Sequence, residues 1–290
     1  MPMISVNGTQ LYYEINGASD IPLVLVHGSW GDHHNWDTVV PALARSFRVL
    51  TFDRRGHSKS AREDVPGTLH DDVMDVVALV EALEFAPAHI VGNSFGASIT
   101  LRLACERPDL FTSLTAHEPP LFALLEGDAM LQAPLAAMDQ RVGAVAELLR
   151  SGDINAGARL FVETIAFGPG AWDSLPERMR QTFISNALTW FDELQDPHWN
   201  RLDLHRLRRF TKPALLTRGD QSPPFFPAVV AQVARALPQA SQHLFAGAGH
   251  VPHLEQTGAY VEVLTGFIAG TQERPGVSAD LATEGRGLSP

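Results

Sequence analysis

Short apolar runs alternate with amphipathic stretches along most of the chain. Weakly alternating positions on either side of Asn7 and Gly8 predict a β-hairpin, because Asn-Gly is a favoured two-residue turn. Fully apolar runs of strand length predict six more strands, at residues 21–26, 47–52, 88–91, 114–116, 214–216 and 243–245. Strands that are apolar on both faces are typical of a buried parallel sheet. A helix is expected over 72–85, so the pattern as a whole predicts an α/β chain.

Roughly a hundred residues between the strands expected at 114–116 and 214–216 contain no run typical of a strand. Amphipathic periodicity instead predicts three helices, over 136–149, 156–165 and 178–194. A helical block inserted between two strands of one sheet is expected to form a cap. We place the core at 1–119 and 206–270, the cap at 120–205, and a disordered tail, rich in small and charged residues, at 271–290.

Composition and charge limit the classes of function that the chain can have. The chain is 45% hydrophobic and 19% charged, as expected of a globular protein, and no apolar run approaches the roughly 18 residues of a membrane helix. The start, residues 1–4, lacks the character of a secretory signal. A net charge of −11 disfavours binding to nucleic acid. Because Cys105 is the only cysteine, no internal disulfide can form, and we expect a cytoplasmic protein that binds no membrane.

A Gly-x-Ser-x-Gly motif follows the strand expected at 88–91. Residues 92–96 read Gly-Asn-Ser-Phe-Gly, and an apolar helical run follows them. This strand–turn–helix context is the setting of a nucleophile elbow. A serine on such a strained turn leaves no room for side chains where strand and helix nearly touch, which accounts for Gly92 and Gly96. Ser94 is therefore the predicted nucleophile.

A nucleophilic serine needs a base, and the base needs an orienting carboxylate. His250 lies in a glycine-rich loop directly after the last expected strand, and Asp220 follows the strand before it. Because the carboxyl ends of parallel strands meet at one edge of the sheet, both should lie near Ser94. The chain order Ser94, Asp220, His250 is that of the α/β hydrolases and not of the common serine proteases. We predict these residues as the catalytic triad.

Two backbone amides are expected to bind the developing oxyanion. One belongs to Phe95, the residue after the nucleophile. The other should come from the loop after the first apolar strand, where Gly28 permits a tight turn. Ser29 is the predicted donor there, with Trp30 as the near alternative. His27, at the strand end, is interpreted as a hydrogen-bonded brace of this loop.

No metal or cofactor is expected. His33 with His34, and His250 with His253, have no further ligand at a recognised spacing. Residues 28–31 do not supply the Gly-x-Gly-x-x-Gly pattern of a dinucleotide site.

With these motifs the chain resembles the α/β-hydrolase fold superfamily, in its cap-bearing group of esterases and lactonases. The matching segments are residues 27–30 (His-Gly-Ser-Trp), 53–58 (Asp-Arg-Arg-Gly-His-Ser), 92–96, 219–220 (Gly-Asp) and 249–253 (Gly-His-Val-Pro-His). The resemblance implies an eight-stranded, mostly parallel sheet flanked by helices, with an inserted cap. It also implies a structural role for the Asp-Arg-Arg-Gly loop. The serine at position 94 departs from the epoxide hydrolases and haloalkane dehalogenases, which use an aspartate nucleophile.

The resemblance also offers a second candidate for the triad acid. In some relatives the acid follows the strand after the nucleophile helix, the position that Glu118 holds in residues 116–120. Glu118 is therefore the alternative to Asp220.

The expected activity is hydrolysis of a small or medium carboxylic ester or lactone through an acyl-enzyme. Cleavage of a carbon–carbon bond in ring-fission products is the alternative, and a non-hydrolytic receptor on the same fold is the alternative from another class. The expected partner is the small-molecule substrate, and a homodimer stays open. Aromatic residues of the cap should form its core and partly line an apolar pocket: Phe161, Phe167, Trp172, Phe183, Trp190, Phe191 and Trp199.

Overall fold

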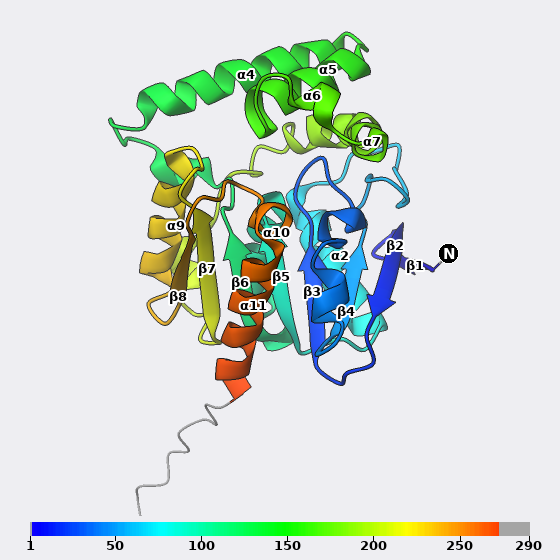
Figure 1. Ribbon diagram of the computed structural model, residues 1–290, viewed down its shortest axis with the longest axis vertical. Helices are drawn as coiled ribbons and strands as arrows, with labels where there is room; N and C mark the ends of the chain where they lie inside the picture. The colour runs from blue at the N-terminus through cyan, green and yellow to red at the C-terminus, as the bar shows by residue number, and fades with distance from the viewer. Residues whose placement is uncertain (1, 273–290) are drawn as a thin grey trace, which may run out of the picture.

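One mixed sheet forms the centre of the protein, for which a computed structural model describes residues 2–272 (Figure 1). Its eight strands lie in the order β1-β2-β4-β3-β5-β6-β7-β8. The strands are β1 (Met3–Val6), β2 (Thr9–Asn16), β3 (Pro22–Val26), β4 (Arg48–Phe52), β5 (Ala88–Asn93), β6 (Phe111–His117), β7 (Ala214–Gly219) and β8 (Ser241–Phe245). Strand β2 pairs antiparallel with β1 and β4, and all other pairs are parallel. The predicted hairpin, the six further strands and the mostly parallel sheet are confirmed.

Helices cover both faces of the sheet. The core helices are α1 (Val40–Leu43), α2 (Leu69–Ala82), α3 (Phe95–Glu106), α8 (Leu204–Leu207), α9 (Phe225–Ala236), α10 (Pro252–Glu255) and α11 (Thr257–Gln272), with 3-10 turns η1 (His33–Trp36) and η2 (Pro108–Leu110). Because side chains alternate along a strand, Val24 and Val26 of β3 pack towards α2, α3 and α9. Leu23 and Leu25 point to the opposite face, towards α1 and α11. Each face of the sheet thus packs against its own apolar cluster, so the central strands must be apolar on both faces. This is why they stand out in the sequence as continuous apolar runs.

The helix expected over 72–85 is α2, which begins three residues earlier than predicted and ends three residues earlier. Its start is fixed by a capping box, in which the Thr68 side chain accepts from the Asp71 amide and the Asp71 carboxylate accepts from the Thr68 amide. The chain then turns at Glu84, whose φ is 55°. Local capping, and not the apolar stripe, therefore sets both ends.

Between β6 and β7 the chain is helical, and every residue of this stretch is described. It contains η3 (Phe122–Leu125), α4 (Gln132–Arg150), α5 (Ile154–Phe161), the π-helical turn η4 (Val162–Ala166), α6 (Ala171–Ser174) and α7 (Glu177–Glu193). Helices α4 to α7 lie together above one edge of the sheet (Figure 1). They share an apolar cluster in which Val145, Ala158 and Ala187 pack with Trp190 and with Trp30 of the core. The cap helices expected from periodicity are thus present, and the boundary at 120–205 stays a prediction.

The expected tail at 271–290 lies almost wholly outside the described residues. Its first two residues instead complete α11, which runs to Gln272. None of the helices within residues 2–272 combines the length and the apolar character that a membrane crossing requires.

Truncating a buried strand residue of this core should destabilise the folded protein. Leu50 of β4 is fully buried, and Leu50→Ala should lower the free energy of unfolding by about 2–5 kcal/mol through lost burial and a cavity. Val65 is 78% exposed, so Val65→Ala should change it by less than about 0.5 kcal/mol. Urea denaturation of both variants measures the difference; equal midpoints would contradict this placement of the core.

Candidate active site

Ser94 occupies a sharp turn between β5 and α3. Its φ of 56° and ψ of −123° are strained for a residue with a Cβ. The backbones around it nearly touch: a Cβ on Gly92 would lie 2.3 Å from the Gly96 carbonyl oxygen, and one on Gly96 2.2 Å from the Val26 carbonyl oxygen. A Cβ on Gly28 would lie 3.0 Å from the Cβ of Ser94. The glycines predicted to make room for the turn are therefore required by backbone packing.

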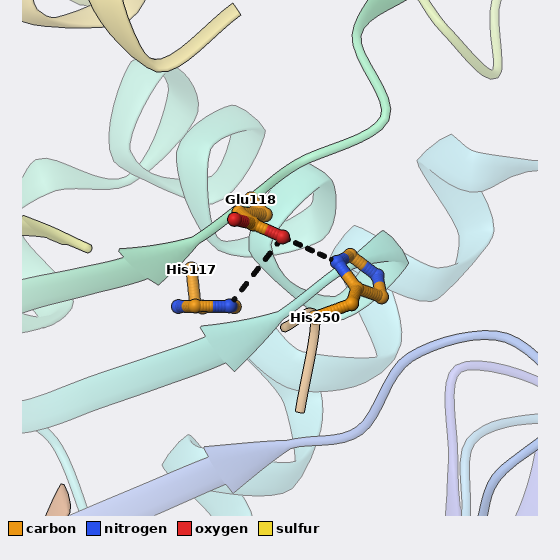
Figure 2. A group of neighbouring side chains, drawn as sticks. All are labelled: His117, Glu118 and His250. Carbon is orange, nitrogen blue, oxygen red and sulfur yellow. Dashed lines mark hydrogen bonds and ion pairs between the residues drawn. The ribbon is translucent and has the colours of Figure 1, made fainter. Parts of the chain in front are cut away.

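His250 lies against Glu118. Its Nδ1 is 2.7 Å from Oε2 of Glu118, whose side chain is fully buried. Figure 2 shows the two side chains turned toward each other. His250 also stacks on the Phe226 ring, with centroids 4.4 Å apart. With Nδ1 hydrogen-bonded to the carboxylate, Nε2 is the ring nitrogen left to exchange a proton.

Other donors hold Glu118 in place. The Gly219 amide donates to Oε1 at 2.8 Å, and the Ser222 hydroxyl donates to Oε2 at 2.8 Å. His117, whose Nε2 is 3.6 Å from Oε2, bonds Thr217 through Nδ1. Burial holds the pKa of His117 well below its usual value, so this imidazole is neutral. Ser222 and His117 were not recognised from the sequence, because neither belongs to a motif.

Among the described residues, His250 is hydrogen-bonded to Glu118 and makes no hydrogen bond to Asp220, so the geometry favours the alternative acid. Asp220 Oδ1 accepts from the Gly247 amide at 2.7 Å and from its neighbour Gln221 at 3.0 Å, and the side chain is exposed. The loop before His250 lies against the backbone of Gly219, where a Cβ would be 2.3 Å from the Ala248 carbonyl oxygen. Asp220 therefore holds the outside of this loop, while His250 reaches across to the alternative acid, Glu118.

The loop after β3, expected to supply an oxyanion donor, is braced by His27. The ring Nε2 accepts from the Arg54 amide at 3.0 Å, and Nδ1 donates to the Gly28 carbonyl oxygen at 2.8 Å. Burial lowers the pKa of His27 to about 4, so the ring stays neutral and can accept from an amide. His27 thus makes the contacts of the structural brace that was predicted. The amides of Ser29 and Phe95, with Trp30 as the alternative, remain the predicted oxyanion donors.

A cavity of about 640 Å³ lies between the cap and the sheet edge. Ser94, His250, Ser29 and Phe95 all line it, so the residues expected to act together share one chamber. Its aromatic walls come from both core and cap: Trp30, Phe122, Phe161, Phe167, Phe183, Trp190, Trp199 and Phe226. Trp172 and Phe191 instead pack within the cap cluster. The volume is in the range typical of small-molecule sites.

Among residues 2–272, two clusters have ligand atoms close enough to hold a metal ion: His117, Glu118 and His250, and Asp32, His33 and Asp53. In the first, both histidines and the carboxylate make the hydrogen bonds described above. In the second, Asp53 accepts from His33 Nδ1 at 2.6 Å and from the His33 and Lys59 amides. These bonds account for both clusters without an ion, and the expectation of no metal stays a prediction.

Comparison with known proteins identifies the class. The family model for the alpha/beta hydrolase fold matches residues 21–257, and the chain belongs to this family. The serine between β5 and α3, the histidine after β8 and the mostly parallel sheet agree with that membership.

Particular relatives match in part. A hydrolase of Pseudomonas aeruginosa PA01 is 25% identical with a TM-score of 0.75, covering 92% of this chain and 97% of its own. The enol-lactonase of Burkholderia xenovorans LB400 is 23% identical with a TM-score of 0.71, over 92% and 100%. The uncharacterized hydrolase YraK of Bacillus subtilis is 35% identical over 45% of this chain and 48% of its own length. For three curated relatives, the match to this chain covers between 28% and 48% of the relative's own length.

Adding one methyl group at the elbow should damage the fold locally. In Gly96→Ala the new Cβ meets backbone that cannot rotate away, so the free energy of unfolding should fall by more than about 2 kcal/mol. Gly143 is also helical but has no neighbouring atom within 4 Å, so Gly143→Ala should raise stability by up to about 1 kcal/mol. Thermal denaturation of the pair tests the packing; similar shifts in both would contradict it.

Proposed function

We propose that the protein is a serine hydrolase that cleaves a carboxylic ester or lactone through an acyl-enzyme. One observation carries the proposal: a strained serine lines the same chamber as a histidine that is hydrogen-bonded to a buried glutamate. The strained backbone conformation of Ser94 costs free energy of folding, and residues in such conformations cluster at active sites.

In the proposed first step the Ser94 hydroxyl attacks the carbonyl carbon and gives its proton to Nε2 of His250. Glu118 accepts from Nδ1–H, fixes the tautomer and stabilises the imidazolium that forms. The tetrahedral oxyanion accepts hydrogen bonds from the amides of Phe95 and Ser29. The intermediate collapses when His250 returns the proton to the leaving alcohol oxygen.

In the second step His250 takes a proton from water, whose oxygen attacks the acyl-Ser94 carbonyl carbon. Collapse of this second intermediate releases the acid and restores the Ser94 hydroxyl. Ser94 Oγ and His250, both among the described residues, make no hydrogen bond to each other in this structure. Such bonds often tighten only when substrate is bound.

The charge of the chamber favours a neutral substrate. Carboxylates of Asp32, Asp37, Glu193 and Glu255 lie along it, and Arg178 is the only Lys or Arg among its lining residues. Arg178 is already paired with Asp37 at 2.9 Å. A substrate carrying its own carboxylate would therefore find no free cation there, whereas the aromatic walls suit an apolar acyl or ring group.

The serine mechanism predicts covalent labelling by a fluorophosphonate. Wild-type protein should be labelled at Ser94, and Ser94→Ala should lose both the label and all ester turnover above background. Turnover of aryl esters, lactones and ring-fission products by the same two proteins would identify the bond that is cleaved. Folded, unlabelled wild-type protein would support the receptor alternative, and turnover confined to ring-fission products would support carbon–carbon hydrolysis.

The geometry also predicts which carboxylate matters. Glu118→Gln keeps the shape but removes the negative charge, and its one oxygen is held by the Gly219 amide, so an NH2 group faces Nδ1 of His250. We therefore expect kcat to fall by roughly 10³- to 10⁴-fold. Asp220→Asn loses only an exposed hydrogen bond to Gly247, and kcat should fall by less than about tenfold. Steady-state kinetics on an aryl ester compares the two variants. The reverse ranking would restore Asp220 as the acid.

A further inference from the structure

Helix α7 of the cap holds the loop at residues 28–31, from which the oxyanion amide is expected. Asn186 and Glu193 lie seven residues apart, and therefore on one face of the helix. Asn186 Nδ2 donates to the Gly31 carbonyl oxygen at 2.8 Å and to that of Trp30 at 3.3 Å. Glu193 contacts the same loop at Ser29. The loop is thus fastened to the cap at both of its ends.

Two short hydrogen bonds hold the Glu193 carboxylate. The Ser29 hydroxyl donates to Oε2 at 2.5 Å, and Arg54 Nη2 donates to Oε1 at 2.7 Å. Glu193 and Arg54 are buried and Ser29 is half-buried, so the carboxylate has little contact with solvent. Hydrogen bonds to a buried charged group are stronger than those between neutral groups, and they restrict both partners.

Arg54 ties this contact to the rest of the site. Its Nε and Nη2 donate to the two carboxylate oxygens of Asp72, at 3.1 and 2.9 Å. Its Cζ lies 4.7 Å from the centroid of the Phe95 ring. One buried guanidinium therefore contacts Glu193, the partner of Ser29, and the side chain of Phe95, which bears the other expected oxyanion amide.

A carboxylate close to a developing oxyanion would by itself oppose catalysis. Here Glu193 faces the guanidinium of Arg54 at 2.7 Å, which offsets part of its charge, although Arg54 is also paired with Asp72. The carboxylate acts on Ser29 through a directed hydrogen bond.

We propose that Glu193 is a positioning residue that holds Ser29, from the cap, where its backbone amide can bind the oxyanion. This inference rests on the proposed serine-hydrolase function. Asn186 holds the other end of the loop, so the cap does more than enclose the substrate: it sets the geometry of the oxyanion site.

Steady-state kinetics of Glu193 variants tests the role. Loss of one oxyanion donor costs about 10²- to 10³-fold in kcat. Since Glu193→Ala would loosen Ser29 without deleting its amide, kcat should fall by about 10- to 100-fold, with KM changed by less than about threefold. Glu193→Gln can keep its oxygen on Arg54 and donate from its NH2 group to the Ser29 hydroxyl oxygen, so it should recover most of this loss. Asp192→Asn, the neighbouring position paired with Arg62, removes the same charge and should leave kcat unchanged.

A double-mutant cycle separates this contact from general damage to the fold. Ser29→Ala removes the hydroxyl but keeps the amide, so it should lower kcat as Glu193→Ala does. The double variant should be no slower than the slower single variant, because both break one contact. Additive losses, or a fall in Glu193→Ala that appears only in KM, would overturn the positioning role.

Hydrogen–deuterium exchange gives a readout that does not depend on activity. Amides of residues 28–31 should exchange faster in Glu193→Ala than in wild-type or Asp192→Asn protein. Unchanged exchange would contradict the inference whatever the kinetics. Faster exchange in a protein whose Ser94 takes no fluorophosphonate would instead show that the contact exists and that the proposed hydrolase function is wrong.

Discussion

The close approach of three backbones at residue 94 is the constraint on which the site depends. Strand β5, helix α3 and the end of β3 come within van der Waals contact there, so that Gly92 and Gly96 admit no side chain. Ser94 is left with a positive φ and a hydroxyl pointing out of the sheet edge. The same turn places Phe95 at the first position of α3, where its amide has no partner within the helix. The proposed nucleophile and the proposed oxyanion donor are thus placed by the same backbone packing.

The remaining groups are placed by loops that bond to one another. The order β3-β5-β6-β7-β8 sets the loops that follow these strands side by side at one edge. Glu118, after β6, is held by the Gly219 amide and Ser222 of the next loop. His250, after β8, reaches Glu118 because its loop passes over Gly219 at backbone contact. The histidine–carboxylate pair therefore depends on three strands, although its atoms come from two.

The strands and the turn at Ser94 could be predicted from the sequence, because hydrophobic periodicity and glycine spacing reflect them directly. Apolar runs located β3 to β8, alternation around an Asn-Gly turn located the hairpin of β1 and β2, and the glycines around Ser94 located the elbow. The sequence left the acid open between Asp220 and Glu118, because both follow strands at the same edge. Which of them faces His250 depends on side-chain direction, including a φ of 43° at Glu118, and this has no sequence signal. The roles of Asn186 and Glu193 were missed for a similar reason, since polar residues on an amphipathic helix are usually interpreted as its solvent face.

The buried cluster of Arg54, Asp72 and Glu193 is better explained by geometry than by stability. Removing charges from water costs several kcal/mol per ion, and apolar residues of similar volume are often as stabilising as a buried ion pair. A guanidinium, however, binds carboxylates only in defined directions. Arg54 engages Asp72 through two nitrogens and Glu193 through one of them, so α2, the loop after β4 and the cap helix α7 are held in one relative position. An apolar cluster would allow these elements to shift, and a shift of α7 would carry the Ser29 hydroxyl with it.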